Sequence, residues 1–426
     1  MTDTILAGQT LYRFENGLRL LVDPMPGLKT FALNALIHGG TRFETEAQSG
    51  WAHLLEHMVF KGAGGRDARA LAEAVEHRGG TINASTGYEH TRFEVRGMNA
   101  LMPIALQIVT DLMFRAAIDA EELAREKKVV EQEINEAFDT PDDHVFDLLQ
   151  DAMFEGQALG RPILGSRQSL QGADPGHLRA FAQALYAPHQ IVICLSGGVS
   201  PEEVYAVAKP LIDTVPGHAG FGAPEPLRFT AGHRAQKRKI EQANIALGFD
   251  AVSRYSQDII PLRLFSEILG GGMASRLFQE AREARGLAYA IDAWATPYRD
   301  GGVFGVSAGC APEDADALVE LIQRVMVELS TDPTQAELER ARAQFQTSLF
   351  LNHEGAASRA ATFTSQLSTF AKVFTLDEVS AEIDKVSRDD LVHVGGHLTA
   401  QAAFARAFLG PGVQGARKGP VLASSH

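Results

Sequence analysis

The sequence predicts an α+β protein of two homologous domains, each a mostly antiparallel β-sheet packed with helices, related to one another as an internal repeat. The chain has 426 residues, more than a single hydrophobic core usually organises. Residues 217–226 are rich in glycine and proline and have no apolar periodicity, which is typical of a linker. The segments on either side repeat the same order of strands and helices. We therefore expect an N-terminal domain at 1–216, a linker at 217–228 and a C-terminal domain at 229–426.

The N-terminal half begins with an apolar strand at 31–37. An apolar helix is predicted within 49–62, and a second helix at 67–78. A strand-like run then extends from Thr81 to Arg96, and a strongly helical, charged run follows at 121–134. This half is therefore expected to combine a sheet with at least three helices.

The first of these helices carries the sequence His53-Leu54-Leu55-Glu56-His57. Positions i, i+3 and i+4 of a helix share one face, so His53, Glu56 and His57 lie together. Two imidazoles one turn apart can hold one metal ion, and the adjacent carboxylate can act as a general base. The order H-x-x-E-H is the reverse of the H-E-x-x-H zinc protease motif. The alternative interpretation is a polar stripe on a surface helix.

A third ligand is expected from the helical run at 121–134. Glu126 and Glu133 are seven residues apart, two helical turns, and therefore face the same way. One can reach the metal, and the other can accept the second ring N–H of a ligand histidine, which fixes its tautomer. Without the motif at 53–57, a solvated helix face would be the preferred interpretation of so charged a run.

The motif at 53–57, followed by Glu133 with Glu126 one heptad earlier, resembles the pitrilysin or insulinase family of zinc peptidases. The chain length resembles the bacterial, mitochondrial-processing-peptidase-like branch of that family. Glu131 competes with Glu133 for the position of third ligand, and the seven-residue spacing from Glu126 favours Glu133.

The resemblance implies one Zn²⁺ per chain, with His53, His57 and Glu133 as its ligands. It implies that Glu56 is the general base of peptide hydrolysis. It also implies that Glu126 holds a ligand histidine without binding the metal itself.

The C-terminal half repeats the order of elements: a strand at 243–249, helices at 260–269 and 275–285, and strand-like runs that end near Ala308. An alignment of the two halves shows that the second has lost the predicted metal-site residues. The residues opposite the five predicted positions are Leu262, Phe265, Ser266, Ala341 and Ser348. The second half is thus expected to bind no metal.

Two further segments resemble functional parts of the family. The run 79–86 is similar to an edge strand on which an extended peptide adds by main-chain hydrogen bonds, with Asn83 and Ala84 against the substrate. An ordinary hairpin is the alternative. A segment of the second half is similar to the family's Arg and Tyr pair, here Arg282 and Tyr289, which reach the substrate over the zinc. A guanidinium can anchor a carbonyl, and a phenol can donate to an oxyanion.

Composition and charge exclude several classes of protein. The net charge of −14 makes nucleic acid an unexpected partner. Neither a signal peptide nor an apolar run of transmembrane length is apparent, so a cytoplasmic protein without membrane contact is expected. Cys194 and Cys310 lie in apolar runs and are expected to pack in the core.

Together with the family resemblance, these observations predict a zinc-dependent endopeptidase that cleaves short or unfolded peptides, bound in extended form. The resemblance further implies a closed chamber formed by two chains, either a homodimer or a heterodimer with a related subunit. The alternative is a non-catalytic peptide-binding or assembly subunit of a heterodimeric peptidase. A purely structural metal site is the third possibility, although such sites usually have four protein ligands.

Overall fold

The computed structural model describes residues 2–4 and 8–411. This part of the chain forms two compact units, each built from three segments. Unit 1 contains Met1–Ile134, Ile163–Glu225 and Leu349–Thr375. Unit 2 contains Asn135–Pro162, Pro226–Ser348 and Leu376–His426. The chain passes from one unit to the other at several places. One of them, Glu225 to Pro226, lies inside the predicted linker. The others make both units discontinuous in sequence, which a single division at 217–228 does not anticipate. Residues 412–426 of the predicted second domain lie outside the described residues.

Unit 1 is built on a seven-stranded sheet. Its strands in spatial order are β1 (Thr2–Thr4), β2 (Thr10–Arg13), β3 (Arg19–Pro24), β9 (Ile191–Gly197), β4 (Thr30–Ile37), β8 (Thr91–Met98) and β7 (Thr81–Thr86). All neighbouring strands are antiparallel except β3 and β9. The predicted single run from Thr81 to Arg96 is a hairpin, because the Gly87 N–H donates to the His90 carbonyl at 2.8 Å and reverses the chain.

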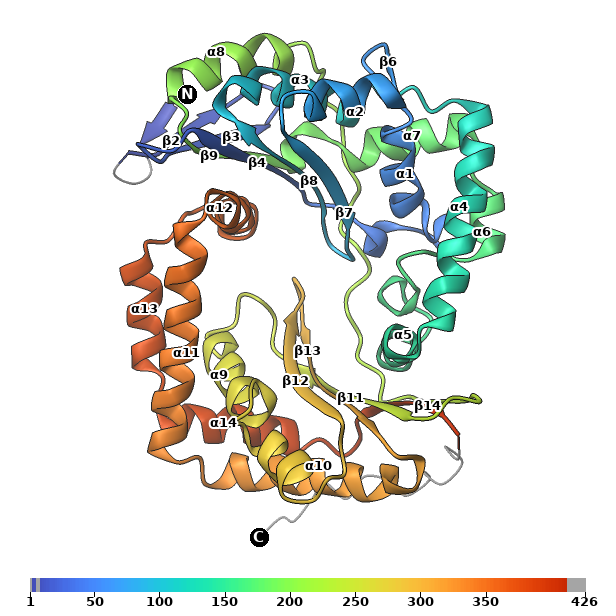
Figure 1. Ribbon diagram of the computed structural model, residues 1–426, viewed down its shortest axis with the longest axis vertical. Helices are drawn as coiled ribbons and strands as arrows, with labels where there is room; N and C mark the ends of the chain where they lie inside the picture. Colours follow the sequence, from blue (N-terminus) through green and yellow to red (C-terminus); the bar gives the residue numbers. More distant parts are fainter. Residues whose placement is uncertain (1, 5–7, 412–426) are drawn as a thin grey trace. The chain divides into compact units, whose positions relative to one another are not determined.

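The helices of unit 1 lie on both faces of this sheet. They are α1 (Trp51–Val59), α2 (Ala68–Glu76), α3 (Met102–Phe114), the first part of α4 (Ala120–Asp139), α6 (Arg167–Gln171), α7 (Pro175–Leu185), α8 (Pro201–Ile212) and α12 (Ala356–Phe370). Short 3₁₀ turns lie at η1 (Thr41–Phe43), η2 (Glu46–Gln48), η3 (Asn99–Leu101) and η5 (Pro188–Gln190), and a two-stranded ribbon joins β5 (Gly62–Ala63) to β6 (Arg66–Asp67). Figure 1 shows α3 and α8 on one side of the sheet and α12 on the other. The central strands are consequently apolar on both faces.

Helix α12 belongs to the C-terminal half of the sequence but covers the N-terminal sheet. Its apolar residues Phe363 and Leu367 pack on Leu21 and Cys194 of the strands. A buried ion pair fixes its start: the Arg359 guanidinium donates to the two carboxylate oxygens of Asp23 at 2.7 and 2.6 Å. Cys194 is fully buried with a free thiol, so the prediction that it packs in the core is confirmed.

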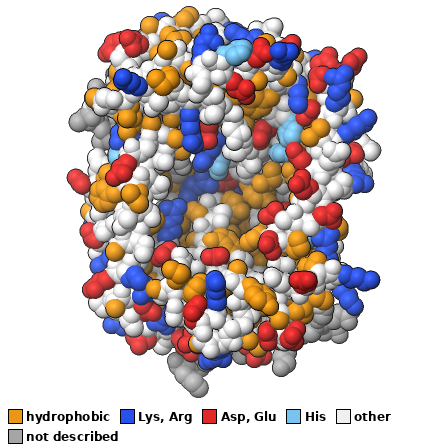
Figure 2. All heavy atoms as spheres, in the orientation of Figure 1, with side chains coloured by type: hydrophobic (Ala, Val, Ile, Leu, Met, Phe, Trp, Pro, Cys, Tyr) orange, Lys and Arg blue, Asp and Glu red, His pale blue; other side chains and the backbone are white. Residues whose placement is uncertain are grey.

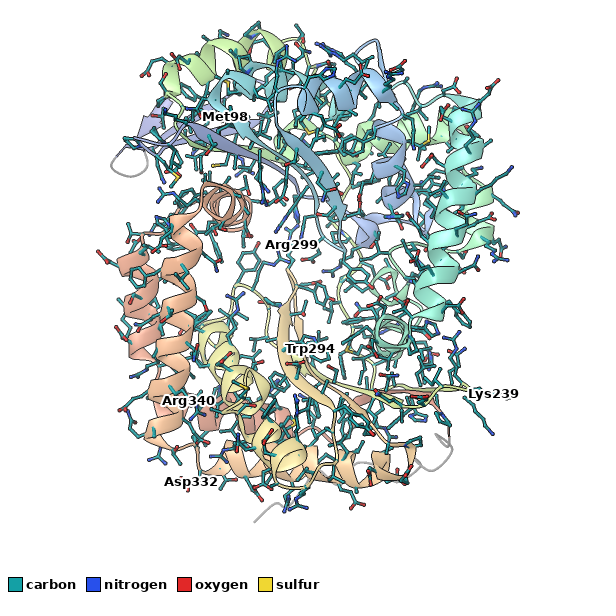
Figure 3. All side chains as sticks on the ribbon, viewed as in Figure 1. Met98, Lys239, Trp294, Arg299, Asp332 and Arg340 are labelled. Atoms are coloured by element: carbon teal, nitrogen blue, oxygen red, sulfur yellow. The ribbon has the colours of Figure 1, made fainter. Side chains whose placement is uncertain are left out.

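Unit 2 has a five-stranded sheet in the order β10 (His233–Lys237), β14 (Ala405–Gly410), β11 (Ala243–Ala251), β13 (Gly302–Cys310) and β12 (Ala290–Pro297). Its helices are α5 (Pro141–Met153), α9 (Ile259–Gly270), α10 (Ala315–Thr331), most of α11 (Gln335–Glu354), α13 (Leu376–Lys385) and α14 (Arg388–Thr399), with 3₁₀ turns η4 (Ala158–Gly160) and η7 (Pro312–Asp314). Trp294 projects from β12 (Figure 3), and its ring meets Phe146 of α5 edge-on at 5.2 Å. Thus α5, from the N-terminal half, packs in unit 2.

The two sheets share one strand order, so the predicted α+β fold with an internal repeat is confirmed. The order β3-β9-β4-β8-β7 corresponds to β10-β14-β11-β13-β12, and in each sheet the first of these pairs is parallel. Helices α4 and α11 each have 20 residues and begin at Ala120 and Gln335, which the sequence alignment places opposite one another. The predicted helix at 275–285 differs from expectation: its central part, Phe278–Glu283, is a π-helix (η6), in which the Ala284 N–H donates to the Gln279 carbonyl at 2.9 Å.

Two surface properties bear on partners. Acidic and basic side chains are interspersed over the face in view (Figure 2), and acidic residues outnumber basic ones, 53 to 39. No helix of the described residues combines the length and the apolar character needed to cross a membrane.

Candidate metal centre

Helix α1 begins after a residue, Gly50, whose backbone conformation favours glycine. Gly50 precedes the helix with φ of 85°, and a Cβ atom there would lie 2.5 Å from the Leu164 carbonyl oxygen. The first backbone N–H groups of the helix are satisfied by Glu44, whose carboxylate accepts from Gly50 N at 2.9 Å and from Ala52 N at 2.7 Å. A negative charge at this end also suits the helix dipole. The start of α1 is therefore fixed independently of any ligand.

The apolar side of α1 determines where the motif residues face. The buried residues of the helix are Trp51, Ala52, Leu54, Leu55, Met58 and Val59. They join the main core of unit 1, and leave His53, Glu56 and His57 half-buried on the opposite side. The helical periodicity therefore directs the three polar groups to one place.

The structure brings His53, His57 and Glu133 together. One ligand atom from each of these residues lies within 4.8 Å of the others, and this is the one such cluster of three or more among the residues described. The Glu133 Oε2 atom lies 3.5 Å from His57 Nε2 and 3.8 Å from His53 Nε2. The competing Glu131 is not part of the cluster. Because Glu133 lies near the middle of α4, its backbone is held by the helix.

These separations suit a metal ion better than they suit hydrogen bonds. A tetrahedral ion with bonds of about 2.1 Å would hold its ligand atoms roughly 3.4 Å apart. Within the described part of the chain, Glu133 Oε2 is buried and has no hydrogen-bond partner, although buried polar atoms normally have one. Burial and then the neighbouring His57 lower the pKa of His53 to about 4, so its imidazole is neutral and free to bind a metal near neutral pH. The three residues therefore fit a zinc ion, and its ligand set would leave one position open.

Glu126 supports His57 from the side away from the other ligands. Its buried carboxylate lies 3.0 Å from His57 Nδ1 through Oε2 and 2.8 Å from Lys61 Nζ through Oε1. The first contact requires the proton of a neutral imidazole to lie on Nδ1, which leaves the Nε2 lone pair for a metal. Lys61 compensates the buried negative charge, because the carboxylate lies almost entirely out of water.

Glu56 lies beside the cluster and is held by Thr86. The Thr86 Oγ1 hydroxyl donates to Glu56 Oε2 at 2.6 Å. Burial raises the pKa of Glu56 above its usual range, and the hydrogen bond from Thr86 opposes this shift. A carboxyl group with a raised pKa is a stronger base in its ionised form, which suits proton transfer near neutral pH.

The other predicted residues lie in two places. In unit 1, β7 is the last strand of the described sheet; Asn83 is exposed on it and Ala84 is buried. In unit 2, Arg282 and Tyr289 are both exposed. The Arg282 guanidinium lies 4.8 Å from the centre of the Phe278 ring, and Tyr289 is anchored by its N–H, which donates to the Gly309 carbonyl at 2.8 Å. Their role toward a substrate stays a prediction.

Three residues of the centre are not among those predicted: Glu44, Lys61 and Thr86. Lys61 lies four residues after His57, one turn further along the chain, so its spacing was a usable signal. Glu44 and Thr86 lie in a loop and at the end of a strand, and their positions relative to α1 depend on tertiary structure. No local pattern in the sequence reveals them.

Comparison with known proteins shows the class to which this architecture belongs. Residues 25–167, which include the whole metal cluster, match the model of the insulinase family (peptidase family M16). Residues 173–345 match the model of the peptidase M16 inactive domain. The second match contains Arg282 and Tyr289. The second match begins before the predicted linker, at residue 173, and ends at residue 345.

Individual relatives extend over nearly the whole chain. An uncharacterized zinc protease of Rickettsia bellii is 31% identical over 400 residues, covering 94% of this chain and 97% of its own. The uncharacterized zinc protease YmxG of Bacillus subtilis is 33% identical over 377 residues, covering 88% and 92%. The chain therefore belongs to the M16 (insulinase) peptidase family, and the predicted resemblance is confirmed.

Two solved structures share the fold. A protease from Helicobacter pylori has a TM-score of 0.89 at 21% identity and covers 95% of this chain and 99% of its own. A peptidase M16 inactive domain from Pseudomonas fluorescens has a TM-score of 0.87 at 20% identity and covers 96% and 98%. Both comparisons extend over the two halves, in agreement with the internal repeat.

Proposed function

We propose that the chain is a zinc-dependent endopeptidase that hydrolyses short or unfolded peptides bound in extended form. The observation that carries the proposal is the arrangement around α1. Three ligand atoms from His53, His57 and Glu133 have separations that suit one ion, and the Glu56 carboxylate is held beside them. Names of relatives as zinc proteases support the same class of activity.

The residues divide the chemistry between them. Zinc held by the two histidines and Glu133 would supply a Lewis acid that polarises the scissile carbonyl and lowers the pKa of water. Glu56 Oε2 accepts the Thr86 hydroxyl, which leaves Oε1 to take a proton from the attacking water. Glu56 would then pass this proton to the nitrogen of the leaving amine. Glu126 keeps His57 in the tautomer that presents Nε2.

Strand β7 is the proposed binding surface for the peptide backbone. In the described sheet it has a partner, β8, on one side only, so its other edge offers N–H and C=O groups to an extended chain. Asn83 and Ala84 lie in this strand and would contact the peptide. We assign Arg282 and Tyr289 to the peptide carbonyls and the developing oxyanion, because a guanidinium and a phenol can both donate hydrogen bonds.

The assembly proposed with this activity is a pair of chains, either a homodimer or a heterodimer with a related subunit, that encloses a chamber. Each chain would bind one zinc ion. Such a chamber would select substrates by size, so short and unfolded peptides should be cleaved and folded proteins spared. Digestion of one sequence in unfolded and in folded, disulfide-closed form measures this selection directly.

The activity is tested by comparing wild type with Glu56→Gln on a set of quenched fluorescent peptides, with zinc content measured in each. Removal of the base should lower the rate about 10²–10⁴-fold while one zinc per chain remains bound. Glu76→Gln is the matched control, because Glu76 is exposed on α2 and makes the same change of charge.

Three other outcomes would change the proposal. Zinc in both proteins with cleavage in neither would favour the non-catalytic peptide-binding subunit. Absence of zinc from both would contradict the assignment of the ligands. Cleavage by Glu56→Gln at the wild-type rate, with zinc bound, would leave a structural metal as the better interpretation.

A further inference from the structure

Strand β7 ends at the residue that holds the proposed base. Thr86 is its last residue, and the Thr86 hydroxyl has a single proton to donate. Two acceptors lie nearby: Glu56 Oε2 at 2.6 Å and the Ala52 carbonyl oxygen at 3.5 Å. The shorter contact takes the proton, because an ionised carboxylate is the stronger acceptor and 3.5 Å is long for an O–H···O bond. The hydroxyl therefore fixes one oxygen of Glu56 and leaves the other free.

The turn that follows Thr86 is bound to η1. The following residues, 87–90, are fastened to η1 by backbone bonds from Thr41 N to Gly87 O at 3.1 Å and from Arg42 N to Tyr88 O at 2.8 Å. The side chains of Arg42 and Glu89 form an ion pair at 2.5 Å and are 1% and 3% exposed. The residues that follow β7 are therefore held to η1 by two backbone hydrogen bonds and one buried ion pair.

The alternation of side chains along β7 gives its two faces different neighbours. Ala84 and Thr86 point to the same face, which is the more buried, whereas Asn83 and Ser85 are exposed on the other. One strand thus offers its outer edge to a peptide backbone and, through Thr86, holds the side chain that would act on that peptide. The distance between a peptide bound to β7 and the Glu56 carboxylate on α1 then depends on the contact between Thr86 and Glu56.

We propose that Thr86 is a positioning residue for peptide hydrolysis: its hydroxyl aligns the Glu56 carboxylate with a peptide bound along β7. This inference rests on the proposed function and extends it to a side chain that is not among the metal ligands. Displacement of a catalytic group by about 1 Å can lower a rate by roughly 10²-fold. Loss of the hydroxyl should therefore affect the chemical step rather than the binding of peptide.

The test compares Thr86→Val, which keeps the shape of the side chain but removes the hydroxyl, with Thr86→Ser, which keeps the hydroxyl. For Thr86→Val we expect kcat to fall about 10–100-fold, KM to stay within about twofold, and one zinc per chain to remain. Thr86→Ser should recover most of the loss. Thr331→Val is the matched control, because Thr331 is exposed at the end of α10 and its hydroxyl also donates one hydrogen bond, to the Val327 carbonyl oxygen at 2.8 Å. It should leave kcat unchanged.

A double-mutant cycle with Glu56→Gln decides whether Thr86 acts through the base. Thr86→Val should cause no further loss in the Glu56→Gln background, because the group that it aligns has been replaced. Additive losses would overturn the proposal, and so would an unchanged kcat in Thr86→Val. An increase in KM without a change in kcat would also contradict it, since that would indicate a role in holding peptide.

A structural measurement separates failure of this inference from failure of the proposed function. Crystal structures of the zinc-loaded wild type and Thr86→Val show directly whether the Glu56 carboxylate keeps its place. If wild type cleaves no peptide, the proposed function fails, and the positioning claim is judged on this comparison alone. A displaced or disordered Glu56 in Thr86→Val supports the claim, and an unmoved Glu56 overturns it.

Discussion

Glu126 lies between a positive side chain and a proposed metal ligand, and its replacement by glutamine offers a sharp test of the centre. The carboxylate accepts from His57 Nδ1 at 3.0 Å and from Lys61 Nζ at 2.8 Å. Glutamine has the same shape but a single acceptor oxygen, and its NH₂ group would face a donor. In Glu126→Gln, either His57 or Lys61 must therefore lose its partner.

The magnitude follows from the burial of the two partners. The Lys61 side chain is 32% exposed and can turn to water, whereas the Glu126 side chain is only 5% exposed. Removal of the charge also leaves the Lys61 ammonium uncompensated near a site for a cation. Loss of such a supporting carboxylate typically weakens metal binding 10–100-fold, equivalent to about 1.4–2.7 kcal/mol of binding free energy.

The assay is a competition titration of the metal-free protein against a zinc chelator of known affinity. Glu131→Gln is the matched control: Glu131 is on the same helix, two residues from Glu133, and lies outside the cluster. We expect a zinc dissociation constant that rises 10–100-fold in Glu126→Gln and stays within about twofold in Glu131→Gln. Equal constants in the two variants would refute the reasoning that Glu126 supports His57.

Two further predictions concern stability. Ala at position 50 would have to adopt φ of 85°, and its Cβ would lie 2.5 Å from the Leu164 carbonyl oxygen. Gly50→Ala should therefore lower the free energy of unfolding by roughly 2–4 kcal/mol and reduce zinc content. Gly27→Ala, also at positive φ but with no atom within 4 Å of its Cβ, should cost only about 1 kcal/mol; similar thermal midpoints for the two variants would contradict the clash at Gly50. Burial lowers the pKa of His53 to about 4, so the unfolded chain, with a pKa near 6.5, binds a proton more readily than the folded one between these values. The metal-free protein should be most stable above pH 6.5 and lose up to about 3 kcal/mol as the pH falls toward 4; urea unfolding over this range should show a smaller loss for His53→Asn, and equal losses would exclude His53 as the cause.

Part of the metal cluster can be predicted from the sequence, because helical geometry places its residues on common faces of two helices, and the family resemblance implies that these faces meet. Any helix over residues 51–59 places His53 and His57 on one face, and the buried apolar residues of α1 show which face turns inward. The spacing of Glu126 and Glu133 works in the same way on α4. The choice of Glu133 over Glu131 needs only the position of its seven-residue partner, and the cluster contains Glu133.

Other parts of the centre depend on contacts that no periodicity records. Glu44 accepts hydrogen bonds from the first backbone N–H groups of α1 although it lies in a loop. Thr86 reaches Glu56 from the end of β7, and the turn that follows is bound to η1 through Arg42 and Glu89. Similarly, residues 278–283 have ordinary helix-forming side chains, yet they form a π-helix. The contacts of Glu44 and Thr86 join segments that are distant in the sequence, and local preference does not record them.

The division of helices between the two compact units makes the N-terminal sheet depend on the C-terminal half of the sequence. The face of the N-terminal sheet that carries Leu21 and Cys194 is covered by α12, which comes from the C-terminal half. A chain that ended at residue 216 would expose this apolar face and would leave the buried carboxylate of Asp23 without Arg359. Removing one partner of a buried ion pair typically costs 3–5 kcal/mol. Conversely, α5 leaves the N-terminal half to pack in unit 2. The second half can therefore have Leu262 and Ser266 where the first has histidines, whereas its loss would remove α12 from the sheet that ends in β7.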